Sequence, residues 1–202
     1  MKHATWILGA LALLLGGVGQ ARAEFIITFS QVGDNVEADG SGSIDTTALT
    51  GPFGVSSVDP PRVNANQGVV ALGPSPAPSQ LDLFVGFSGP ASFGSGTEYD
   101  ASTSSGPRIS IEGAAGGLFL PAGYVSGTSL SDSNTWDNTT ISGLGLTTGT
   151  YTWTWGTGAN ADSLEVIIPS ASATPEPASL TLLGIGALCS LGYGWRRRRQ
   201  SA

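Results

Sequence analysis

The stretch TYTWTWGTGANADSLEVII, residues 150–168, predicts the fold most directly. Its first half alternates threonine with large aromatic side chains, which is the two-residue period of a strand with one buried face. A turn rich in Gly, Asn and Asp follows, and the run 164–168 then has the composition of a second strand. We expect a β-hairpin whose aromatic face lies in the core while the threonines face solvent. The inward residues would be Tyr151, Trp153 and Trp155, set against Thr150, Thr152 and Thr154.

Similar patterns recur between residues 24 and 168. EFIITFSQVGDNVEADGSGSID (24–45) predicts two strands joined at Gly33-Asp34-Asn35. No stretch of this region keeps a helical period over eleven or more residues free of glycine and proline. We therefore predict an all-β fold, a Gly-, Ser- and Thr-rich β-sandwich-like ectodomain. Two further strands are expected, one with Leu81, Leu83, Val85 and Phe87 on one face and one with Ile109 and Ile111 opposite Ser110.

The first 23 residues have the three parts of a secretory signal peptide. Lys2 provides a basic start, an apolar stretch runs from Trp6 to Val18, and Ala21-Arg22-Ala23 forms an A-x-A cleavage site. We expect cleavage after Ala23, so that the exported chain begins at Glu24.

The last residues, TPEPASLTLLGIGALCSLGYGWRRRRQSA (174–202), predict a membrane anchor. Ala178–Trp195 carries no charge, and a helix of that length reaches roughly 27 Å, enough to cross the hydrocarbon core of a bilayer. A run of arginines that would hold the end of the chain in the cytoplasm follows at once: Arg196, Arg197, Arg198 and Arg199. One transmembrane helix is thus expected over 178–195.

The triplet Pro175, Glu176 and Pro177 stands directly before this helix. Triplet, helix and arginine cluster, in that order at the end of the chain, resemble the PEP-CTERM sorting signal. The resemblance implies that residues 175–199 are recognised by an exosortase, a membrane protease or transpeptidase of bacteria that make exopolysaccharide. It also implies that the triplet and Arg196–Arg199 are substrate residues of that processing and have no catalytic role of their own.

Composition excludes several kinds of chemistry for the exported region. Arg62 and Arg108 stand against fourteen carboxylates, a net charge of −12, so nucleic acid is a poor partner. His3 and Cys189 fall in the signal peptide and the expected membrane helix, and the exported region has no lysine. Triads based on His, lysine Schiff bases, His or Cys metal sites and disulfides are therefore not expected. A two-carboxylate glycosidase remains conceivable, but no pair of acids stands out.

Two proline-rich segments mark the organisation of the chain. GPSPAPSQ (73–80) is either a long loop within one domain, 24–168, or a boundary between pieces 24–72 and 81–168. We favour the loop, because the first piece has few large apolar side chains with which to build its own core. Residues 169–174 form an expected stalk before the tail.

Two groups of residues offer alternative binding sites. The aromatic face of 151–155 could stack on sugar rings, although a core role is commoner for such a face. The series Asp39-x-Ser41-x-Ser43-x-Asp45 and an expected loop from Asp132 to Asp137 supply oxygens that suit Ca²⁺. Thr50 stands where an EF-hand needs Glu, and solvated turns are the commoner explanation of these acids. No catalytic, cofactor-binding or metal-binding residue is assigned.

These features lead to one expected function and one alternative. The first is a non-enzymatic bacterial surface or extracellular-matrix protein that crosses the inner membrane transiently, is processed at its tail by an exosortase and associates with exopolysaccharide. The alternative is a carbohydrate-binding or carbohydrate-active secreted module that carries the same tail.

Overall fold

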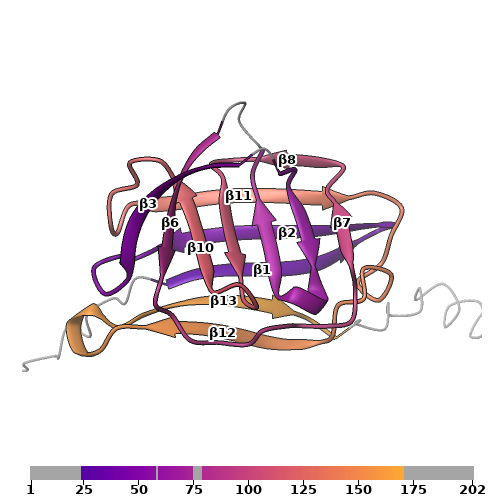
Figure 1. Ribbon diagram of the computed structural model, residues 1–202. Helices are drawn as coiled ribbons and strands as arrows, with labels where there is room; N and C mark the ends of the chain where they lie inside the picture. The colour runs from indigo at the N-terminus through magenta and orange to yellow at the C-terminus, as the bar shows by residue number, and fades with distance from the viewer. Residues whose placement is uncertain (1–23, 58, 75–78, 171–202) are drawn as a thin grey trace, which may run out of the picture.

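A computed structural model describes residues 24–57, 59–74 and 79–170, which form two β-sheets (Figure 1). Sheet A has the strand order β12 (Gly149–Trp155), β13 (Asp162–Ile168), β1 (Glu24–Val32), β2 (Asn35–Ser43), β11 (Ser129–Trp136), β8 (Thr103–Ser105). Sheet B has the order β3 (Thr50–Ser57), β6 (Ser79–Val85), β10 (Gly117–Pro121), β9 (Ile109–Glu112), β5 (Val69–Leu72), β4 (Arg62–Asn64), β7 (Glu98–Asp100). Two short 3-10 helices, η1 (Ala65–Gln67) and η2 (Gly158–Asn160), complete the described elements. The predicted all-β class is confirmed.

The two sheets pack face to face, and the strands of sheet A run across those of sheet B (Figure 1). Such crossing is one of the two usual ways in which sheets stack. A single cluster of buried apolar side chains fills the space between them. Its largest members are Trp136, Trp153 and Trp155, and the ring of Phe29 stacks on that of Trp136 at a centroid distance of 5.9 Å. The core is therefore built from alternate residues of the strands, as the periodicity predicts.

The hairpins that the sequence predicts are present. β1 and β2 pair in antiparallel register across the turn at Gly33 and Asp34. β12 and β13 pair likewise, with Trp153 opposite Leu164. Trp153 is completely buried, whereas Thr154 is exposed and Thr152 half-buried, so the predicted orientation of this strand is confirmed.

Leu81, Leu83 and Val85 lie on one face of β6, as the alternation predicts. Phe84, and not Leu81 or Leu83, is the side chain of β6 that belongs to the central cluster. Leu83 pairs with Phe53 and Phe119 on the opposite, outer face of the sheet. The alternation does not show which of the two faces is inside, because β6 has apolar residues on both, and only the contact with sheet A selects Phe84. The predicted inward placement of Ile109 and Ile111 on β9 is confirmed.

Each sheet contains strands from both sides of the proline-rich stretch 73–80. In sheet B, β3 pairs with β6 and β5 pairs with β9. In sheet A, β2 pairs with β11. Both segments also contribute to the same buried cluster.

The first and last strands of the domain lie side by side and run parallel. Glu24 pairs with Ser163, and Thr28 pairs with Ile167. Because β1 and β13 are parallel, their C-terminal ends lie at the same end of sheet A. The chain therefore leaves sheet A at the end that carries the β1–β2 turn. In Figure 1 this exit end is on the right.

Several predictions fall outside the described residues. They are the signal peptide (1–23) with Ala21 and Ala23, most of the stalk, and the whole sorting tail with its transmembrane helix 178–195. Within the ranges 24–57, 59–74 and 79–170, the structure has no helix with the length and apolar character needed to span a membrane.

Candidate functional site

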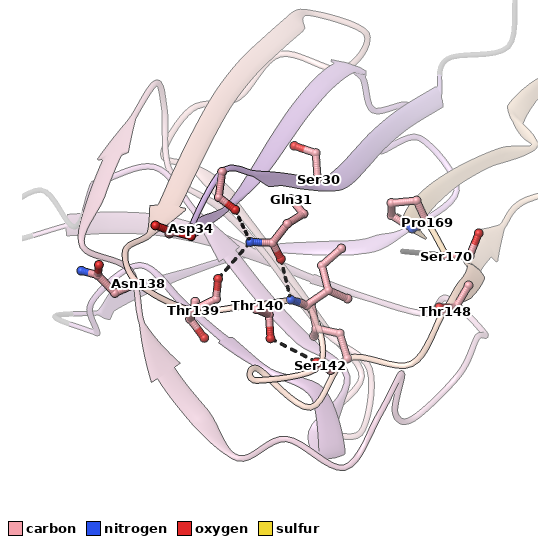
Figure 2. A pocket seen from close by; sticks show the side chains of 13 residues that line it. Ser30, Gln31, Asp34, Asn138, Thr139, Thr140, Ser142, Thr148, Pro169 and Ser170 are labelled. Carbon is pink, nitrogen blue, oxygen red and sulfur yellow. Dashed lines mark hydrogen bonds between the residues drawn. The ribbon is translucent and has the colours of Figure 1, made fainter. Parts of the chain in front are cut away.

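A groove of about 1060 Å³ opens at the exit end of sheet A (Figure 2). Three parts of the chain form it: the end of β1 with its turn, the loop between β11 and β12, and the residues just after β13. Its lining residues are Ser30, Gln31, Gly33, Asp34, Asn138, Thr139, Thr140, Ile141, Ser142, Leu146, Thr148, Pro169 and Ser170. The groove thus lies where the chain leaves the domain toward residues 171–202.

The side-chain amide of Gln31 holds the walls of the groove together (Figure 2). Its Nε2 group donates to the carbonyl oxygens of Gly33, Asn35 and Thr139 at 3.0–3.1 Å, and its Oε1 accepts from the backbone N–H of Ile141 at 3.1 Å. Phe25, Ile27 and Phe29 precede it on the inner face of β1. Gln31 therefore closes the end of the core and joins the β1–β2 turn to the loop that follows β11.

Other lining side chains keep their hydrogen-bonding groups free. The side chains of Asp34, Asn138, Thr148 and Ser170 are exposed and make no hydrogen bond within the described part of the chain. Ile141, Leu146 and Pro169 add apolar surface. Asp34 supplies the one charge among the lining residues, and no cation is among them. The groove therefore suits a neutral or positively charged polar partner.

The aromatic strand does not form a sugar-stacking surface. Trp153 is 0% exposed and Trp155 is 4% exposed, both between the sheets. Each indole N–H has a backbone acceptor: Trp153 Nε1 donates to Pro90 O at 3.0 Å and Trp155 Nε1 donates to Asp45 O at 2.7 Å. Because the faces of both rings are covered by protein, the alternative role proposed for them is wrong.

The acids considered for Ca²⁺ do not converge. Asp39 and Ser41 lie on the solvent face of β2, whereas Asp132 points to the core from β11. The expected loop from Asp132 is in fact the second half of strand β11, and Asp137 follows it at the surface. Nowhere in the described ranges do three His, Cys, Asp or Glu side chains gather in a way that could hold a metal ion. Binding of Ca²⁺ stays a prediction without a preorganised site in this part of the chain.

Asp45 and Asp162 have structural roles instead. The Oδ2 atom of Asp162 accepts from the N–H of Asp45, and its Oδ1 accepts from the N–H of Ser163 at 2.8 Å. Burial raises the pKa of Asp162 against these bonds. The pKa of Asp45 is lowered, chiefly by hydrogen bonds from Thr47. These contacts fix the loop after β2 against the start of β13.

Asp132 is a buried acid that the sequence reasoning placed wrongly. It is 4% exposed, and neither carboxyl oxygen has a hydrogen-bond partner in the described chain. Its neighbour across the sheet is Gly40, where a Cβ would come within 2.9 Å of Asp132 Oδ1. Desolvation raises the pKa of Asp132 to about 8, so the group is a neutral acid at pH 7. A signal in the sequence could have predicted this burial, because alternate residues of 130–136 begin with Leu130 and end with Trp136. Asp132 and Asn134 stand between them on the same face of β11.

The two cations of the described chain are engaged on the outer side of sheet B. Arg62 forms ion pairs with Asp59 and Glu98, each at 3.3 Å, and with Glu112 at 3.8 Å. Arg108 is 6% exposed and donates to the carbonyl oxygens of Gly73 and Pro60, both at 3.2 Å. Both guanidinium groups therefore stabilise the domain and leave the groove without a positive charge.

The groove borders the stalk. The similarity of this chain to known proteins lies in the end of the stalk and the residues that follow the stalk. The model of the PEP-CTERM protein-sorting motif matches residues 173–199. The chain carries a PEP-CTERM sorting motif. The match includes Pro175, Glu176 and Pro177 together with Arg196–Arg199. It confirms the resemblance, and it implies transient anchoring in a membrane and processing by an exosortase before display at the surface or secretion.

No curated protein and no solved structure matches the chain.

Proposed function

We infer that this protein is a non-enzymatic component of the bacterial cell surface or extracellular matrix. It is exported through its signal peptide, held in the inner membrane by residues 178–195, and released or transferred when an exosortase acts at Pro175–Pro177. The observation that carries this function is the sorting motif at residues 173–199. An association with exopolysaccharide belongs to the same proposal.

The structure supports a non-enzymatic role for the domain. Residues 24–170 contain no His, Cys or Lys. Hydrolysis of a glycosidic bond ordinarily needs two carboxyl groups on either side of the bond, and the groove offers Asp34 alone. Asp132 has a raised pKa, as a general acid requires, but it is enclosed in the core and a substrate cannot reach it.

The alternative function is a carbohydrate-binding module with the same tail. The free hydroxyl and amide groups of the groove are the observation in its favour, because neutral sugars are bound through such groups. A glycan array and a reducing-sugar release assay on the mature protein distinguish the two functions. Sugar release that one Asp or Glu substitution abolishes would contradict the non-enzymatic proposal.

The main test is the mass of the protein made in its native host. The mature form is expected to lack residues 1–23 and the segment after Pro175–Pro177. Glu176→Ala should block cleavage but leave membrane insertion intact, since insertion depends on the apolar run and the arginines. Glu37→Ala, on the solvent face of β2, is the matched control and should be processed normally. A surface form that still contains Arg196–Arg199 would refute the proposal.

A further inference from the structure

We propose that the groove at the exit end of the sandwich is a docking surface for the extracytoplasmic side of the processing enzyme. The inference rests on the proposed function, because it needs an enzyme that acts at Pro175–Pro177. It adds a second recognition site, formed by the folded domain, to the one in the tail.

The topology of sheet A places this groove next to the processing motif. Because β1 and β13 run parallel, the start of β1 lies at one end of the strands of sheet A and the exit from β13 lies at the other end. Pro169 and Ser170 are both the last described residues and part of the groove wall (Figure 2). The domain therefore presents the groove, and not the loop of η2 at the opposite end, to whatever holds the tail.

The short intervening chain keeps the enzyme close to the end of the sandwich. Residues 171–174 separate Ser170 from Pro175, and five Cα steps of extended chain span at most about 18 Å. A folded domain of about 100 residues already has a radius of gyration of about 13 Å. An enzyme bound to Pro175–Pro177 is therefore held within about 18 Å of the end of the sandwich, close enough for the two surfaces to meet.

The short tether also makes weak contacts effective. Two sites joined by a short flexible linker meet at an effective concentration in the millimolar range. A few hydrogen bonds from Asp34, Asn138 or Thr148, too weak to hold a free partner, are sufficient at such a concentration. The groove supplies these groups on walls that Gln31 keeps in place.

Charge selects the chemistry of the docked surface. Residues 24–170 have a net charge of −12, and the groove contains Asp34 without any cation. Both arginines of the domain are occupied on sheet B. The partner surface is accordingly a polar loop with positive charge, which the domain attracts as a whole and the groove binds through neutral groups.

The two ends of strand β12 allow a matched test in the full chain. Thr148 and Thr157 flank this strand, both are exposed, and neither side chain has a hydrogen bond within the described chain. Thr148 lies in the groove, whereas Thr157 is at the opposite end next to η2. Thr148→Arg should slow conversion of precursor to mature protein three- to ten-fold in a pulse-chase experiment in the native host. Thr157→Arg should leave the rate unchanged.

Two additional variants separate charge and proximity from bulk. Thr148→Glu, of comparable length and opposite charge, should be processed at least as fast as the wild type. Insertion of ten Gly and Ser residues after Ser170 should make the rate insensitive to Thr148→Arg, because the effective concentration falls. Limited proteolysis of each precursor checks that the sandwich is intact.

The outcomes distinguish the two proposals. A wild-type chain that is never processed refutes the proposed function. A wild-type chain that is processed at the same rate as Thr148→Arg refutes the docking surface alone. Equal slowing by Arg and Glu at position 148 refutes a positively charged partner, and sugar binding lost in both variants without any effect on processing would assign the groove to a saccharide.

Discussion

Strands β12 and β11 both bury polar atoms on the inner face of sheet A, but they differ in whether those atoms have hydrogen-bond partners. On β12 the indole N–H groups of Trp153 and Trp155 donate to backbone carbonyls at 3.0 and 2.7 Å. On β11, Asn134 is bonded through both ends of its amide, whereas Asp132, two residues earlier, has no partner for either oxygen in the described chain. The same core thus contains satisfied polar groups and one unsatisfied acid.

The difference shows which buried polar groups hold the sandwich together. A buried hydrogen-bonded group contributes modestly to stability, but leaving its partner unpaired costs the full desolvation of that partner. Trp153 and Asn134 join sheet A to segments of the opposite layer and its connections. Asp132 joins nothing, and burial disfavours its charged form. Substitution of Asp132 should therefore have an effect opposite in sign to that of substituting Trp153 or Asn134.

The largest expected effect is the loss of Trp153. Trp153→Ala removes a completely buried ring and leaves the carbonyl of Pro90 without its donor. We expect a loss of about 3–5 kcal/mol in the free energy of unfolding, out of a typical 5–15 kcal/mol. Chemical denaturation of the mature protein measures it. A variant as stable as the wild type would mean that the ring does not pack between the sheets.

Asp132→Asn should act in the opposite direction. The pKa of Asp132 is about 8 in the folded protein and near its ordinary value of 3.8 in the unfolded chain, so the folded state binds the proton more tightly. The contribution of Asp132 to stability is therefore most favourable below about pH 4, falls as the pH rises from about 4 to 8 and changes little above about 8. Asn cannot ionise and avoids this loss.

The gain of Asp132→Asn at pH 7 is expected to reach about 4 kcal/mol and to vanish near pH 4. Denaturation of both proteins across this range measures the difference, in which the other carboxylates cancel. Asp39→Asn, on the exposed side of β2, is the control and should show no comparable gain. A difference that does not depend on pH would show that Asp132 is ionised or solvated in the folded protein.

Asn134→Ala should be destabilising by an intermediate amount. The Nδ2 group donates to Ala71 O at 2.8 Å and the Oδ1 atom accepts from Gly73 N at 3.2 Å, so truncation removes two buried hydrogen bonds to the end of β5 and the residue that follows it. We expect a loss of about 2–3 kcal/mol. Asn134→Asp is a useful companion, because it keeps the acceptor for Gly73 and removes the donor to Ala71. Equal stability of wild type and Asn134→Ala would exclude this link between the sheets.

The smallest effects are expected on the outer face of β12. Thr154 is exposed and its side chain has no hydrogen bond in the described chain, so Thr154→Ala should change stability by no more than about 0.5 kcal/mol. Thr152 is half-buried and donates to Glu165 at 3.2 Å, which makes Thr152→Ala slightly more costly, about 0.5–1 kcal/mol. Loss of either hydroxyl with an effect as large as that of Trp153→Ala would reverse the assignment of the two faces.

Local periodicity was sufficient for strands with one apolar face. Alternation of threonine and tryptophan predicted the burial of Trp153, and the same reasoning placed Ile109 and Ile111 in the core. It did not decide the inner face of β6, where Phe84 lies opposite Leu81, Leu83 and Val85. It failed for β11, where Asp132 and Asn134 occupy inward positions of a strand rich in serine. Polar residues in that stretch favoured a loop, because a sequence does not show which partners will be close enough to bury them.

The groove could not have been predicted from the sequence. Its walls come from residues 30–34, 138–148 and 169–170, which parallel pairing of the first and last strands brings to one end of sheet A. The sorting motif is the opposite case. It is read as a linear segment, so its residues and their order carry the signal without any fold.

The sequence by itself determined the sorting motif, the all-β class and the orientation of strand β12, because each depends on residues adjacent in the chain. Tertiary structure decided which face of β6 is inside, how Asp132 comes to be enclosed and neutral, and where the groove lies relative to the tail. These depend on pairing between strands far apart in sequence, such as β1 with β13 and β5 with β9, whose contacts set burial and desolvation. Which side chains are buried depends on how all the strands pack together. The pattern of apolar residues along the sequence only narrows the set of faces that can be buried.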